Sequence, residues 1–162
     1  MSDNLDDARR HASRLLEDFG ATAGIEDIAF NQAGRCDLAF DDQPMTISFD
    51  EDTGDMCIES PVLDIPPSPA WDFYGWVLED NFLSFVNGAG CLAIDRSRGK
   101  IVWLDRRPVS GLSKSIFDRW LSLSIERVEY WVKNLVDRAN SAELAKPDNT
   151  RFSNDTAIVF RP

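Results

Sequence analysis

The stretch GRCDLAFDDQPMTISFDEDTGDMCIE, residues 34–59, decides the fold of this chain of 162 residues. Apolar and polar residues alternate within it in three short runs, at residues 36–40, 45–49 and 56–58. The runs are separated by Asp42-Gln43-Pro44 and by Asp52-Thr53-Gly54, both of which are turn-forming sequences. Alternation with a period of two, interrupted by turns, predicts an antiparallel meander with one apolar and one polar face.

The segments around this meander predict an α+β fold. A further short strand is expected at residues 28–30 and two more at residues 91–95 and 100–105. Apolar residues recur at spacings of three and four over residues 3–19, 70–86 and 113–138, which predicts three helices. Four prolines within residues 61–69 indicate a connection. The order helix, antiparallel strands, helix, strands, helix is typical of a twisted antiparallel sheet with helices packed on it.

The second predicted helix is apolar on nearly every side. Two groups of residues mark its opposite faces: Trp71, Tyr74, Leu78, Phe82 and Phe85 on one, and Phe73, Trp76, Val77 and Leu83 on the other. A helix of this kind is buried on two sides. In a domain this small, the second side is expected to face another subunit.

The charge of the chain is strongly negative and unevenly distributed. It holds 28 Asp+Glu and 17 Lys+Arg, a net charge of −11, and residues 1–66 alone carry −12. Nucleic acids and anionic membranes select basic surfaces, so neither is an expected partner. No apolar run is long enough for membrane insertion, and residues 1–19 lack the pattern of a secretory signal. The acidic half is either a solvated surface or a surface that selects a partner.

No set of residues points to catalysis, a metal or a cofactor. The three cysteines, Cys36, Cys57 and Cys91, form no C-x-x-C pair and are expected to be reduced thiols in the cytoplasm. The single histidine, His11, is expected to be exposed and without a role. The acidic loop that begins at Asp50 fails as a calcium loop, because its twelfth residue is Pro61 where a glutamate is required. We therefore expect a protein that is not an enzyme.

The element order and several local patterns resemble the type III secretion chaperones of the Tir-chaperone (CesT) family, over about residues 3–138. The resemblance lies in apolar core patterns with turn glycines: Leu15-Leu16-x-x-Phe19-Gly20, Ile28-x-Phe30, Gly34-x-Cys36-x-Leu38-x-Phe40-Asp41, Met45-x-Ile47, Leu78-x-x-Asn81, Gly88-Ala89-x-x-Leu92-Ala93-Ile94-Asp95, Gly99-x-Ile101-Val102, Phe117-x-x-Trp120-Leu121 and Tyr130-Trp131.

The resemblance implies a small, acidic, cytoplasmic homodimer without enzymatic activity or cofactor. Such a chaperone binds the N-terminal region of a secreted effector in extended form and keeps it soluble and competent for export. Residues of the first helix and early strands are then candidates for effector binding: Leu5, Leu15, Ile28, Phe30, Phe40, Ile47 and Phe49. Residues of the second helix and the following strands are candidates for the dimer interface: Trp71, Tyr74, Trp76, Leu78, Phe82 and Trp103. Because strands alternate, several of these residues must belong to the core.

Two questions stay open from the sequence. An acidic immunity or regulatory module on a related α+β scaffold would also fit, and it would bind a folded partner. The chain divides into a domain at residues 1–138 and a polar C-terminal extension at residues 139–162, which contains the apolar run Ala157-Ile158-Val159-Phe160. This extension is either partly disordered or packed on the domain. In the second case, deleting residues 140–162 would raise the affinity for the effector.

Overall fold

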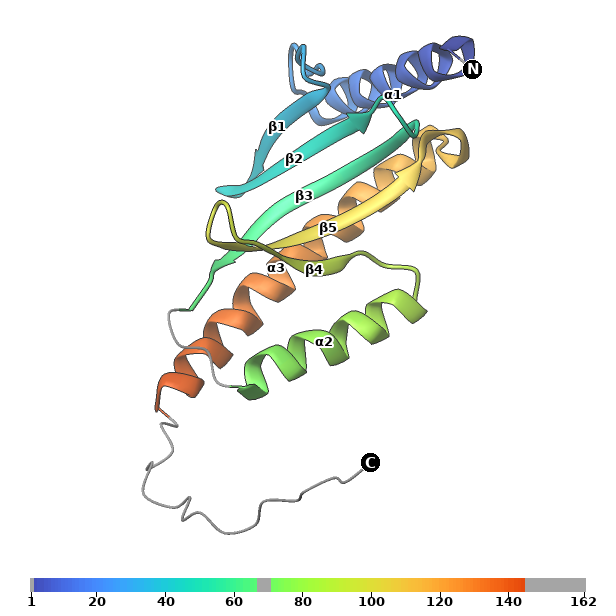
Figure 1. Ribbon diagram of the computed structural model, residues 1–162. Helices are drawn as coiled ribbons and strands as arrows, with labels where there is room; N and C mark the ends of the chain where they lie inside the picture. The colour runs from blue at the N-terminus through green and yellow to red at the C-terminus, as the bar shows by residue number, and fades with distance from the viewer. Residues whose placement is uncertain (1, 67–70, 145–162) are drawn as a thin grey trace, which may run out of the picture.

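The structure is a computed structural model that describes residues 2–66 and 71–144 (Figure 1). Its elements in chain order are α1 (Ser2–Ala23), β1 (Arg35–Phe40), β2 (Gln43–Asp50), β3 (Asp55–Asp64), α2 (Trp71–Val86), β4 (Cys91–Asp95), β5 (Lys100–Pro108), the short 3₁₀ helix η1 (Val109–Gly111) and α3 (Lys114–Leu144). The strands form one antiparallel sheet in the order β1-β2-β3-β5-β4. The predicted α+β class is confirmed.

One face of the sheet carries the hydrophobic core. The long helix α3 runs along this face, with Phe117, Trp120 and Trp131 almost fully buried (Figure 1). From the sheet, Ile47 and Ile58 stand opposite each other on β2 and β3 and are both fully buried. The residues between them on the same strands, such as Thr46, Ser48 and Glu59, point to the other face. The alternation in residues 34–59 therefore predicted the two faces correctly.

The strand predicted at residues 28–30 is wrong. This segment belongs to the loop between α1 and β1, and the loop closes at Asn31. The Asn31 backbone N–H donates to the Arg35 carbonyl oxygen (2.8 Å), and the Arg35 N–H donates to the Asn31 side-chain oxygen (3.0 Å). These bonds turn the chain into β1 directly after residues 28–30, so these three residues do not pair as a strand of the sheet.

The connection predicted from residue 61 also begins too early, because β3 continues to Asp64. Pro61 pairs with Val102 of β5, and the register then shifts between Pro61 and Leu63. A bulge of this kind accommodates a proline within a strand. The strand thus continues across a residue that the sequence pattern marks as a break.

The first helix extends beyond Gly20, where the sequence predicted its end. It continues to Ala23 and ends at Gly24, whose φ of 71° lies in the left-handed region. The Ile25 N–H closes the end by donating to the Gly20 carbonyl oxygen (2.9 Å). Gly20 serves packing instead, because a Cβ at this position would lie only 2.0 Å from Cγ2 of Ile28.

The third helix is longer than predicted as well, since it runs to Leu144 and so includes the first residues assigned to the extension. The apolar run at residues 157–160 lies outside the described residues.

The turn between β1 and β2 consists of Asp41 and Asp42, with φ of 47° and 69°. Positive φ at both central residues is the geometry of a type I′ hairpin turn.

Candidate functional site

Strand β1 is one edge of the sheet, and part of its outer side is open. The Arg35 N–H and C=O point away from β2, because both pair with Asn31. Backbone groups alternate along an antiparallel strand, so the next outward pairs belong to Asp37 and Ala39. An extended segment can therefore pair with β1 over residues 37–39.

A row of half-buried apolar side chains lies beside this open edge. Leu38 and Phe40 of β1 face the helices and pack at the margin of the core. The Phe40 ring lies 6.4 Å from the ring of Phe19 on α1, which in turn lies 6.3 Å from that of Phe117. The row offers apolar contacts to the side chains of a strand added at β1.

The candidates for effector binding divide into two groups. Four of them, Leu15, Ile28, Ile47 and Phe49, are buried in the core and expose almost no surface in this chain. The remaining three, Leu5, Phe30 and Phe40, are partly exposed. Leu5 lies apart from the other two, near Gly54 in the turn between β2 and β3.

Phe19 and Leu38 were missing from those candidates, although they border the open edge. Leu38 falls between Cys36 and Phe40 in the same alternating run. That spacing alone could have placed it on the same face.

The candidates for the dimer interface also differ in exposure. Leu78 and Phe82 are 68% and 66% exposed on the outer side of α2. Tyr74 and Trp76 are half-buried, and Trp103 is fully buried in the core. The side chain of Trp71 lies outside the described residues.

The half-buried Trp76 ties α2 to α3. Its ring packs edge to face on Trp131 at 5.5 Å, and the Arg138 guanidinium lies 3.6 Å from the centre of the Trp76 ring. These contacts hold α2 in place while its outer face stays uncovered in this chain. Next to that face, a groove of about 390 Å³ runs between α2 and β4, lined by mostly apolar residues that include Leu78, Leu92 and Ile94.

Strand β4 is the other edge of the sheet, and the side chain of Asn81 from α2 reaches its outer side. The Asn81 Nδ2 donates to the Leu92 carbonyl oxygen (2.9 Å), and the Asn81 Oδ1 accepts from the Leu92 N–H (2.8 Å). The amide thus pairs with both backbone groups of Leu92.

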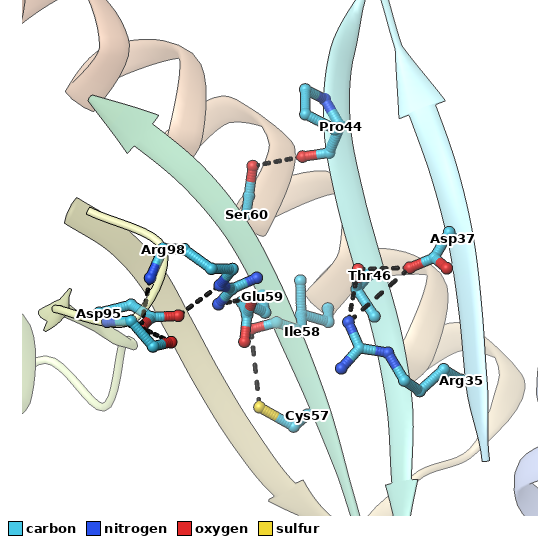
Figure 2. A network of polar contacts seen from close by, with 11 residues as sticks. Arg35, Asp37, Pro44, Thr46, Cys57, Ile58, Glu59, Ser60, Asp95 and Arg98 are labelled. Carbon is cyan, nitrogen blue, oxygen red and sulfur yellow. Dashed lines mark hydrogen bonds and ion pairs between the residues drawn. The ribbon is translucent and has the colours of Figure 1, made fainter. Parts of the chain in front are cut away.

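The face of the sheet opposite α3 carries several ion pairs and hydrogen bonds (Figure 2). Asp37, Thr46 and Glu59 stand in one row across β1, β2 and β3. The Thr46 hydroxyl donates to Asp37 (2.6 Å), while Arg98 bridges Glu59 (2.5 Å) and Asp95. Hydrogen bonds from Ser97 and then Arg98 hold the pKa of the Asp95 carboxyl well below its usual range. These charged groups pair with one another and make this part of the face polar.

A second hollow, of about 360 Å³, lies between β5 and α3. Trp103, Asp105 and Trp120 line it together with Arg107. The Trp120 Nε1 donates to the Asp105 carboxylate (2.8 Å), and the Arg107 guanidinium lies 5.6 Å from the centre of the Trp120 ring. Burial raises the pKa of Asp105. The cluster joins β5 to α3.

The histidine, the cysteines and the acidic residues were the possible reactive or metal-binding groups of the sequence, and their surroundings are as follows. His11 is half-buried, so the expectation of an exposed side chain is wrong: its Nε2–H donates to the Leu112 carbonyl oxygen (2.7 Å) and ties α1 to the loop before α3. Burial raises the pKa of Cys57 to about 11, which keeps this thiol protonated. Within residues 2–66 and 71–144, no cluster of His, Cys, Asp or Glu is arranged to hold a metal ion.

Comparison with known proteins places this fold. The model of the Tir chaperone protein (CesT) family matches residues 14–132, most of the chain. The chain belongs to this family. No curated protein sequence matches this CesT-family chain. Several solved structures share its fold.

Three of these structures illustrate the similarity, and each of them is a complex. The ExsC–ExsE complex contains a chain that is 18% identical, with a TM-score of 0.70, 78% of this chain covered and 95% of that one. The HopA1–SchA chaperone–effector complex has 18% identity and a TM-score of 0.67, with 76% and 94% covered. The Yersinia pestis type III secretion chaperone SycH, solved with a stable fragment of YscM2, has 17% identity and a TM-score of 0.58, with 74% and 98% covered. At these identities the similarity shows the fold.

None of the helices in the described ranges combines the length and the apolar character that crossing a membrane requires.

Proposed function

We propose that the chain is a cytoplasmic chaperone that binds the N-terminal region of a type III secretion effector in extended form and keeps it soluble and competent for export. The observation that carries this proposal is the family match over residues 14–132. Two of the structures that share its fold are named as a type III secretion chaperone and as a chaperone–effector complex. Binding an effector and keeping it soluble require neither catalytic residues nor a cofactor.

The open edge of β1 suits an extended partner. A strand that pairs with Asp37 and Ala39 gains main-chain hydrogen bonds that do not depend on its sequence. Its inward side chains meet the apolar row of Phe19, Leu38 and Phe40. Of the candidates from sequence, Phe30 and Phe40 lie in the part of the chain that leads into and forms β1, so we keep them as effector contacts at this edge. Leu5, which is partly exposed on α1, stays a separate candidate.

The charge near this edge favours a basic partner segment. Asp41 and Asp42 are exposed at the end of β1, and Glu26 and Asp27 are exposed in the loop that precedes it. Residues 1–66 as a whole carry a net charge of −12. Coulomb attraction would then speed association, and added salt would slow it.

A second copy of the chain suits the outer face of α2. Leu78, Phe82, Leu83 and Val86 are all more than half exposed on this helix. Because a two-fold axis brings the same patch of both subunits together, one apolar helix face can form a dimer interface. Of the dimer candidates, Leu78 and Phe82 are available for such contacts, while Trp103 is buried in the core.

The dimer is tested by light scattering on the wild type and on Leu78→Asp. The expected result is twice the mass of one chain for the wild type and a shift toward the single chain for the variant. Leu123→Asp, a matched change at an exposed leucine of α3, should leave the mass unchanged. A monomeric wild type would contradict the dimer without bearing on effector binding.

Effector binding is tested by co-expressing the chain with candidate secreted proteins encoded near its gene and digesting the purified complex with a protease. A chaperone of this kind should protect a segment near the partner's N-terminus that has no compact structure of its own. Protection of a compact folded domain would instead favour the immunity or regulatory module and would overturn the proposal.

A further inference from the structure

The amide of Asn81 occupies the place that a neighbouring strand would take at the edge of β4. An asparagine side chain carries one carbonyl oxygen and one NH₂ group, so it can accept from and donate to the same residue as a peptide unit does. Here it does both, at 2.8 Å and 2.9 Å, with the N–H and C=O of Leu92. Aspartate or leucine at this position could not form the pair.

This single contact removes most of the edge. Outward backbone groups alternate along a strand, so the five residues of β4 present two outward pairs, those of Leu92 and Ile94. With Leu92 paired to Asn81, only Ile94 is left to an incoming strand. The opposite edge, β1, retains two consecutive outward pairs at Asp37 and Ala39.

The surroundings of β4 make an open edge hazardous. Ile94 is 47% exposed, and Leu78 borders the same apolar groove between α2 and β4. An edge strand with unpaired backbone groups beside an apolar surface is a template for another chain. The β4 strands of two copies could pair there in antiparallel fashion.

We propose that Asn81 closes the β4 edge and thereby directs strand addition to β1. The second part rests on the proposed function, since the strand added at β1 is the extended effector. One effector strand then binds per chain, and β4 of a second copy is the segment that Asn81 keeps off. Asn81 is thus a positioning residue at the β4 edge, a role distinct from that of the apolar outer face of α2 in the dimer.

The test compares Asn81→Ala with Asn87→Ala. Asn87 follows the same helix and bonds only to Leu83 within it, so it is a matched asparagine without a strand contact. In dilute Asn81→Ala, the Leu92 amide should exchange with solvent at least about tenfold faster than in the wild type, as loss of roughly one net hydrogen bond implies. At higher concentration the variant should associate beyond the wild type's own state, and the Leu92 and Ile94 amides should become protected together. Asn87→Ala should behave as the wild type.

A double variant locates the new contact. Ile94→Pro removes the outward N–H of β4, a position where an edge strand tolerates proline. Added to Asn81→Ala, it should abolish the concentration-dependent association. Asn81→Ser provides the same test with a smaller change if the alanine variant does not fold.

Two results would overturn the proposal. One is a folded Asn81 variant whose Leu92 amide remains protected when dilute. The other is a variant whose Leu92 amide is unprotected at every concentration while its association matches that of the wild type, because Asn81 would then be only a tie between α2 and β4. Both readings use this chain alone, so failure would leave effector binding untouched.

Discussion

Replacing Gly20 with alanine should destabilise the protein, although alanine is normally the better helix residue. Gly20 lies within α1, where alanine would gain about 0.5–1 kcal/mol over glycine. Its Cβ, however, would lie 2.0 Å from Cγ2 of the buried Ile28 and 3.1 Å from the Ile25 carbonyl oxygen. Overpacking of this kind costs about 1–3 kcal/mol. The clash therefore exceeds the gain in helix propensity, and Gly20→Ala should lower the free energy of unfolding.

Gly75 supplies the matched control, because it also lies within a helix, α2, and a Cβ there would meet nothing within 4 Å. Gly75→Ala should stabilise the protein by about 0.5–1 kcal/mol. The propensity term is common to both changes, so the difference between the two variants isolates the overpacking cost of about 1–3 kcal/mol.

The assay is urea unfolding followed by the fluorescence of the buried Trp103, Trp120 and Trp131, at one protein concentration and with m-values checked for equality. In an Ile28→Ala background, where Cγ2 is gone, Gly20→Ala should lose most of its penalty, because only the contacts at 3.1 Å with the Ile25 carbonyl oxygen and at 3.2 Å with the Cβ of residue 28 remain. If Gly20→Ala stabilises the wild type as much as Gly75→Ala does, Ile28 does not pack against α1 and the account of this loop is wrong.

Two further changes test the turn and the buried carboxylate. Asp42→Gly should stabilise the β1–β2 hairpin by about 0.5–1 kcal/mol, because Asp-Gly is a preferred type I′ turn and glycine adopts the φ of 69° without strain; a lower urea midpoint would contradict the turn assignment. Burial raises the pKa of Asp105, so the folded state keeps a proton that the unfolded state has lost, and stability falls as pH rises from the ordinary carboxyl pKa to the raised one. Asp105→Asn should remove this slope, so its stability relative to the wild type should increase through that interval; a constant difference across pH would contradict the assignment.

Alternation in the sequence was sufficient to predict the faces of the sheet, because the period of side chains along a strand is fixed by the backbone. It was not sufficient to predict where strands stop. Residues 28–30 alternate as a strand would, but the bonds between Asn31 and Arg35 close the loop first. Pro61 signals a break, but pairing with β5, which is distant in sequence, carries β3 past it.

The candidate site was only partly predictable for a related reason. Apolar residues that alternate along a strand give the same sequence pattern whether they face the interior or border an edge. Ile47 and Phe40 were therefore equally good candidates for effector binding in the sequence, although only Ile47 is fully buried. That β4 forms the second edge depends on the insertion of β5 between β3 and β4, and no local pattern reports it. Asn81 likewise acquires its role only when α2 lies beside β4.

The most direct measurement of the central claim is the affinity of an effector's N-terminal segment for Ala39→Pro compared with Ile94→Pro. Both changes remove one outward N–H, the first from the open edge of β1 and the second from the closed edge of β4, at positions where edge strands tolerate proline. The account predicts that Ala39→Pro weakens binding about tenfold or more, as loss of a backbone hydrogen bond and its neighbours implies, while Ile94→Pro leaves binding unchanged. Equal affinity of Ala39→Pro and the wild type, with both folded, would contradict strand addition at β1.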